Sequence, residues 1–169
     1  PASRAFGGAV ADAPWPPSGD EPPLWMTEGA HPDAEAMFVA FWKGSHNNGF
    51  DWHLGRFLPT HYPANDKGCL VILQTMHRGW GADYGGRGVV DVDWIMSLKG
   101  HDGAGTIAMK WLCALADEHD VVLILVAGSG PGGRMKTLPT RVLQAFYKRF
   151  GFVKHGRDPK AMHRLPRGA

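Results

Sequence analysis

Apolar positions along the chain recur at two spacings, which predict two kinds of element. From Asp33 to Trp42 the spacing is helical. The apolar side chains that share a face there are Met37, Phe38, Phe41 and Trp42. Pro32 and the acidic residues of the first turn favour a helix start at this point. We therefore expect a helix over this segment, with the apolar stripe in the core.

Strand-like runs form the second pattern. The long runs are Cys69–Met76, Gly88–Leu98 and Val121–Ala127, and shorter candidates are Leu24–Thr27 and Ala161–Leu165. The first two long runs are consecutive and predict an antiparallel pair. If the run at 88–98 alternates regularly, its side chains divide between two faces. Asp91, Asp93 and Ile95 then share one face, and Val90, Val92 and Trp94 share the other.

Two further helices are predicted by the segments that follow these strands. One begins near Gly105, and the other is launched by Thr137 or Thr140 as a cap and ends near Phe152. Residues 1–22 are dense in Pro, Gly and Ala without periodicity, which is typical of a poorly ordered arm. We expect residues 23–169 to form a single domain, since this length suits one core.

Composition narrows the class of protein. The chain has 169 residues, a hydrophobic fraction of 44% and a formal net charge of +2. No apolar run approaches the ~20 residues that span a bilayer, so we expect no membrane partner. Cys69 and Cys113 form no disulfide or metal pattern and lie in apolar runs, which predicts buried thiols and fits a cytoplasmic location. His46, His53 and His61 lack ligand spacing, so no metal site is expected.

The glycine-rich stretch Gly100–Thr106 joins the strand at 88–98 to the next helix. Glycines let backbone N–H groups approach a ligand closely, and a helix start adds unpaired donors and the positive end of the helix dipole. The stretch lacks the Lys-Ser/Thr ending of a P-loop and the spacing of a dinucleotide-binding turn. It therefore predicts a site for a phosphate or pyrophosphate of another kind of ligand.

The order of strand, glycine-rich turn, helix and strand, ended by Phe146-Tyr147-x-x-Phe-Gly-Phe, resembles the GCN5-related N-acetyltransferase (GNAT) superfamily over roughly residues 88–165. Gly103-Ala104-Gly105 matches the glycine positions of that family's pyrophosphate loop. The chain departs from the pattern at two places. Gly100 stands where the family has Gln or Arg, with Lys99 beside it as an alternative charge, and no Asn follows Ala127.

The resemblance implies a fold of the α/β (α+β) class, with a mixed, mainly antiparallel central sheet flanked by helices. It also implies acetyl-CoA as co-substrate, with pantetheine between the strand at 88–98 and the strand at 121–127, which separate in the family. In such a fold, an aromatic side chain of the first helix would face the acceptor substrate. The residues expected to bind the coenzyme are Ile95, Met96, Leu98, Lys99, Gly100, His101, Asp102, Gly103, Ala104, Gly105, Thr106 and Phe146.

Three residues carry the expected chemistry. An acid on the central strand, Asp93 first and Asp91 second, would take the proton from the ammonium group of the acceptor. Tyr147, a phenol of ordinary pKa, would return a proton to the departing thiolate. A backbone N–H near Ile95 or Met96 would stabilise the oxyanion. The alternatives for these side chains are ordinary polar-face carboxylates and a packing tyrosine.

The function expected from this resemblance is transfer of an acetyl group from acetyl-CoA to a primary amine by direct attack, without a covalent enzyme intermediate. The acceptor is a small-molecule or protein amine, and the chain a monomer or homodimer. Two alternatives stay open. A non-catalytic module that binds acyl-CoA or a partner fits the departures at Gly100 and after Ala127, and a tRNA- or DNA-modifying acyltransferase fits the basic C-terminal run, although nucleic acid is not favoured.

Overall fold

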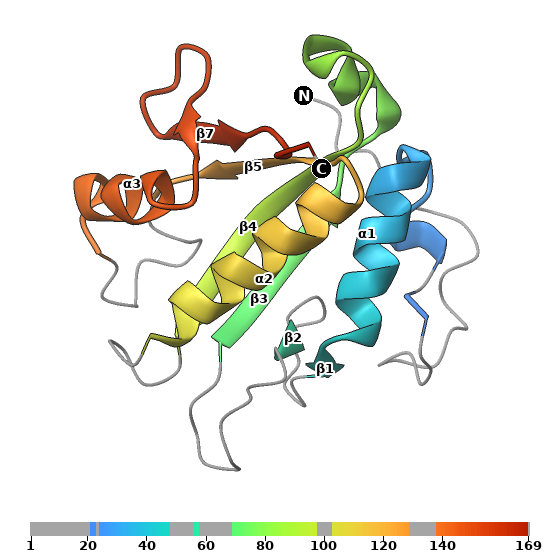
Figure 1. The fold of residues 1–169 in the computed structure, drawn as a ribbon, viewed down its shortest axis with the longest axis horizontal. Coiled ribbons are helices and arrows are strands. Elements are labelled where there is room, and N and C mark those ends of the chain that lie inside the picture. Colours follow the sequence, from blue (N-terminus) through green and yellow to red (C-terminus); the bar gives the residue numbers. More distant parts are fainter. Residues whose placement is uncertain are drawn as a thin grey trace, which may run out of the picture.

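The computed structural model describes residues 21–22, 24–47, 56–57, 69–97, 103–128 and 138–168 (Figure 1). Within these ranges the chain forms a mixed α/β structure whose single sheet is mainly antiparallel and flanked by helices, as the sequence predicts at this level. The strand order is β1-β2-β3-β4-β5-β7-β6, and only the pair of β4 and β5 is parallel among the described strands.

The elements have the following bounds. The strands are β1 (His46–Asn47), β2 (Arg56–Phe57), β3 (Cys69–Thr75), β4 (Val89–Ser97), β5 (Val122–Val126), β6 (Val153–Lys154) and β7 (Ala161–Arg164). The helices are α1 (Pro32–Lys43), α2 (Ala104–Glu118) and α3 (Thr140–Lys148), with short 3-10 helices η1 (Leu24–Met26) and η2 (Arg78–Tyr84). Each long element that the apolar pattern predicts is present, with ends shifted by one or two residues, except that α3 ends at Lys148, four residues before the expected end near Phe152.

Helix α1 forms where the apolar spacing predicts a helix, because a local cap and burial of one face both favour it. The His31 side chain caps the helix by accepting a hydrogen bond from the backbone N–H of Asp33, 3.3 Å away. The predicted stripe is buried in the core, and its rings pack on one another, with 6.0 Å between the ring centres of Phe38 and Phe41. Burial of this stripe, more than local propensity, holds the helix on the sheet.

Two local expectations are wrong. The segment Leu24–Met26 is a 3-10 helix and not a strand, because its backbone bonds locally: the Thr27 N–H donates to the Leu24 carbonyl at 3.1 Å. The expected cap Thr140 is the first residue of α3, and Pro139, whose backbone is extended, precedes it as the cap position. The other candidate cap, Thr137, and residues 1–20 of the expected arm lie outside the described residues.

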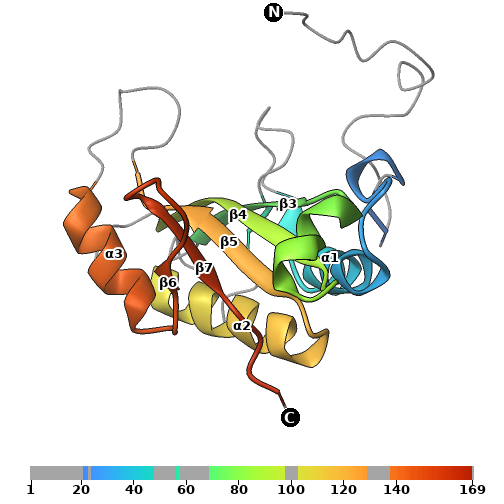
Figure 2. The same cartoon turned by 90° about the horizontal axis from the view of Figure 1, so that it is seen from above.

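The two faces of the sheet are covered differently. Helices α1 and α2 pack together on one face, below the sheet in Figure 2, and bury the main core against side chains from β3, β4 and β5. The opposite face carries a smaller cluster of Tyr84, Val89 and Val122, over which η2 lies. Helix α3 lies beside β6 and β7 in both views. Among the described helices, none has the length and apolar character needed to cross a bilayer.

Candidate functional site

Strand β4 contains a β-bulge at its centre. Trp94 pairs with Ile72 and Val92 pairs with Leu73, so the register shifts by one residue and Asp93 has no partner on β3. The extra residue reverses the alternation that follows it. Ile95 therefore packs against the main core together with Val92, instead of sharing a face with Asp91. The expectation of regular alternation along this strand is wrong for this reason.

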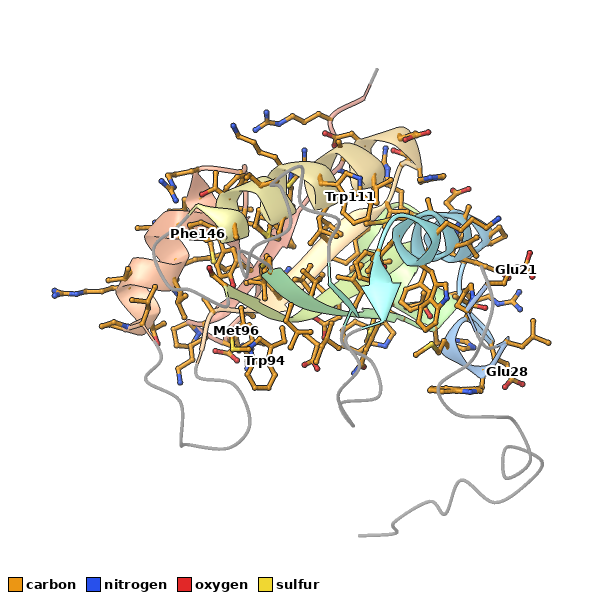
Figure 3. The ribbon with its side chains drawn as sticks, turned by 90° about the horizontal axis from the view of Figure 1, so that it is seen from below. Glu21, Glu28, Trp94, Met96, Trp111 and Phe146 are labelled. Atoms are coloured by element: carbon orange, nitrogen blue, oxygen red, sulfur yellow. The ribbon has the colours of Figure 1, made fainter. Side chains whose placement is uncertain are left out.

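The bulge turns Trp94 and Met96 toward the face that α1 and α2 leave uncovered. Figure 3 shows these two side chains next to each other on the side of the sheet away from α2. Both are partly exposed. Regular alternation would instead put Trp94 on the face opposite Asp91. The amino-acid composition of the strand does not reveal the bulge, because one extra residue does not change the apolar character of the segment.

Strands β4 and β5 separate after a short parallel pairing. The paired residues are Val89 with Val122, Val90 with Leu123 and Asp91 with Ile124. Strand β4 continues to Ser97 with β3 on its other side, whereas the end of β5 pairs with β7. Among the described residues, Val92–Ser97 have no β5 partner. We call this opening between β4 and β5 the wedge, and a strand edge that borders it presents backbone N–H and C=O groups to a ligand.

Asp91 lies at the apex of the wedge, in the last pair before the strands part. It shares the face of Val89, opposite the main core, because Val90 between them points into that core. Burial raises the pKa of its carboxyl group to about 6, and the nearby charge of Asp93 adds to the shift. Asp93 itself is exposed at the bulge. A half-buried carboxyl that titrates near neutrality suits proton abstraction better than an exposed one does.

Helix α2 starts at the open end of the wedge, since β4 leads into it. Its N-cap is Gly103 with φ 84°, a left-handed conformation that favours glycine. Gly105 lies in that turn. Phe146 approaches it closely, because a Cβ at Gly105 would meet the Phe146 ring at 3.8 Å. Gly103, Ala104, Gly105 and Phe146 are thus brought together, at a helix start of the kind that binds anions.

The remaining residues of the predicted phosphate loop, Leu98, Lys99, Gly100, His101 and Asp102, lie outside the described residues. Thr106 lies in the first turn of α2 next to Gly105, and it also lines a groove on the side of that helix. Ile95 and Met96 border the wedge on β4. The structure therefore brings part of the predicted coenzyme set together, at the start of α2 and along the end of β4.

Tyr147 is buried, with 7% of its surface exposed, and packs between Phe146 and Phe152 at centroid distances of 5.3 and 5.8 Å. Burial raises the pKa of its phenol to about 12, with a further contribution from Cys69. The expectation of an ordinary pKa is therefore wrong. The phenol stays protonated throughout the usual assay range, so it can donate a hydrogen bond to a thiolate but is a weak proton donor.

A polar cluster that the sequence analysis missed lies on the face of Asp91. In the register of the sheet, Asp91 pairs with Ile124, and Ile124 pairs with His163. The Nδ1 atoms of His163 and His155 are 2.9 Å apart, and the Tyr84 hydroxyl lies 3.3 Å from His155. Burial and the neighbouring His155 lower the pKa of His163. These residues come from three separate segments, which is why no sequence spacing marks them.

Within the described part of the chain, no three His, Cys, Asp or Glu side chains come together in a group that could hold a metal ion. His53 and His61 lie outside that part, as does the side chain of His46. Both cysteines are buried thiols, as predicted. Compared with models of known protein families, with curated proteins and with solved structures, the chain matches none.

Proposed function

We propose that this chain is an acetyl-CoA-dependent N-acetyltransferase that transfers the acetyl group to a primary amine by direct attack. The observation that carries the proposal is the separation of the parallel strands β4 and β5 after the Asp91–Ile124 pair, at the end of the sheet where α2 begins. A separation of these two strands is what the sequence resemblance to the GNAT superfamily implies.

The wedge suits a long, thin ligand with an anionic end. The edge of β4 that borders the wedge carries alternating backbone donors and acceptors, which suit an amide-containing arm such as pantetheine. The first turn of α2 directs backbone N–H groups and the positive end of the helix dipole toward the open end of the same wedge, which suits a pyrophosphate. One extended thioester carrier satisfies both features, with its carbonyl toward the apex where Asp91 lies.

Asp91 then serves as the general base. In its ionised form it takes a proton from the acceptor ammonium, directly or through water, and the neutral amine attacks the thioester carbonyl. The tetrahedral intermediate collapses with release of the coenzyme thiolate. Tyr147 assists departure as a hydrogen-bond donor, since a phenol with a pKa of about 12 does not transfer its proton fully to a thiolate. Most of the rate derives from positioning the two reactants.

Replacing Tyr147 by phenylalanine tests whether the chain is an enzyme. We expect kcat to fall about 10-fold to 100-fold, with the KM for acetyl-CoA changed less than about 3-fold, because the phenol acts mainly on the departing thiolate. Thiol release is measured with a panel of small amines, a basic protein and charged tRNA as acceptors. The unsubstituted chain is the reference, because Tyr84, the other tyrosine among the described residues, contacts His155 on the face of Asp91 and is unsuitable as a control.

The same assay separates the alternatives. Saturable binding of acetyl-CoA without thiol release for any acceptor would indicate a non-catalytic module that binds acyl-CoA. Thiol release with charged tRNA alone would indicate an acyltransferase that modifies nucleic acid. Equal turnover of the Tyr147→Phe variant and the unsubstituted chain would remove Tyr147 from the mechanism.

A further inference from the structure

A basic pocket of about 480 Å³ lies outside the wedge, between one side of α2 and the segments that follow α3 and β7. Its walls are made by Thr106, Lys110, Cys113, Ala114, Asp117, Arg149, Phe150, Arg164 and Arg167. The α2 residues recur at helical spacing on one stripe, while Ala108, Met109 and Leu112 face the core. The pocket and the wedge are therefore on different faces of the helix.

Arg164 supplies a buried cation to this pocket. Only 2% of its surface is exposed. Its Nε donates to the Phe150 carbonyl at 2.9 Å and its Nη2 donates to Asp117 at 2.7 Å. Its Nη1 is enclosed and has no hydrogen-bond partner among the described residues. A buried guanidinium nitrogen without an acceptor is costly, and an anionic ligand is the acceptor that relieves the cost best.

The charge of the pocket is strongly positive. Four cationic side chains line it against the single carboxylate of Asp117. That carboxylate is already engaged on both oxygens, by Arg164 and by the backbone N–H of Arg167 at 2.7 Å. Among the described residues, Lys110, Arg149 and Arg167 form no ion pair with a carboxylate. Arg149 is held over the Phe146 ring, 4.9 Å from its centre, which limits its freedom.

We propose that this pocket binds a phosphomonoester carried on a small molecule of about nucleotide size. The volume fits a ligand of that size, and Phe150 and Cys113 offer an apolar surface to the rest of the molecule. Lys110, Arg149 and Arg167 surround the phosphate, with the Thr106 hydroxyl as a further donor. The buried positive charge of Arg164 in the wall of the pocket adds to the attraction for a phosphate dianion. The inference uses neither Asp91 nor Tyr147, so it stands apart from the proposed reaction.

Calorimetric titration with adenosine 3′,5′-bisphosphate and with inorganic phosphate tests the pocket. We expect saturable binding that weakens about 10-fold or more in the double variant Lys110→Gln, Arg149→Gln, and that weakens with added salt. Both side chains are exposed, so the fold is retained, and thermal unfolding verifies this. Lys148→Gln is the matched control, because Lys148 is an exposed neighbour that does not line the pocket.

A comparison of coenzyme A with dephospho-coenzyme A identifies the source of the phosphate. If the phosphate belongs to the coenzyme, the double variant loses affinity for coenzyme A and keeps its affinity for the dephospho form. If the phosphate belongs to a separate ligand, the double variant binds both coenzyme forms as the unsubstituted chain does, and adenosine bisphosphate binding alone is weakened. Failure of all four probes to bind saturably, or equal binding by the double variant and the Lys148→Gln control, would overturn the proposal.

Discussion

Asp91→Asn is expected to lower kcat/KM by about 100-fold to 1,000-fold at pH 7.5, because the amide cannot take the proton from the acceptor. In the unsubstituted enzyme, kcat/KM should rise with pH through about 6, the pKa to which burial and Asp93 raise the Asp91 carboxyl. The variant should lack this acidic limb. Thiol release measured from pH 5 to pH 9 with a single acceptor gives both results.

Asp93→Asn discriminates between the two candidate bases. It removes the like charge that helps to raise the pKa of Asp91, so the acidic limb should move to lower pH while most of the turnover remains. If Asp93→Asn abolishes turnover and Asp91→Asn does not, the base is Asp93, as the sequence analysis first favoured. The structure favours Asp91 because only its carboxyl is partly buried at the apex of the wedge.

Asp91→Asn should stabilise the fold although it lowers activity. The pKa of Asp91 is raised in the folded state, so its ionisation opposes folding once the pH exceeds its unfolded value. Asp91→Asn should therefore increase the free energy of unfolding at pH 8 and change it little at pH 4. Urea unfolding at the two pH values measures this. A stabilised but inactive variant is the pattern expected of a catalytic group, because function and stability compete at such sites.

Asp117→Leu is expected to reduce the free energy of unfolding by about 3 kcal/mol at pH 7, because it leaves the buried Arg164 guanidinium without its carboxylate. The Arg164 side chain is 3% exposed, and the pair spans α2 and β7 at 2.7 Å. Urea unfolding measures the loss, with an unchanged slope m indicating the same unfolded state. Glu118→Leu is the matched control, because Glu118 is the exposed neighbour in α2.

The pH dependence of this ion pair has a definite sign. Burial acts to raise the pKa of Asp117, but hydrogen bonds from Arg164 and Arg167 outweigh it, so the pKa is lowered overall. The stabilisation is then complete above the unfolded pKa of 3.8 and disappears as the pH falls through the lower folded value. The difference between the parent chain and Asp117→Leu should be constant near neutrality and shrink in acid. A second substitution, Arg164→Met, should restore much of the loss at pH 7, because it removes the unpaired buried charge.

How far the sequence predicts this fold depends on the range of the interaction that decides each element. Apolar periodicity and local caps place α1 and the strands β3, β4 and β5, since burial of one face determines them. The strand expected at Leu24–Met26 failed because a three-residue apolar segment is short enough for local bonding to win. The two-residue strand β6 was missed, because only its pairing with β7 makes it a strand.

The candidate site was predictable only in part. The motif around Gly103 and Tyr147 identified a helix start and a buried phenol, and the structure describes both. The rank of Asp91 and Asp93 depends on the bulge, which is set by pairing with β3 and leaves no trace in composition. The basic pocket was missed because Lys110, Arg149 and Arg164 come from segments that only the tertiary fold brings together.

We expect acetyl-CoA to bind in the wedge between β4 and β5, and an amide-resolved NMR titration with acetyl-CoA shows whether it does. We expect saturable shifts concentrated at Val92–Ser97 of β4, at 125–128 beyond the last pairing of β5 with β4, and at 103–106 in the first turn of α2. Absence of saturable shifts at millimolar acetyl-CoA, or shifts confined to surfaces away from these three segments, would contradict the account.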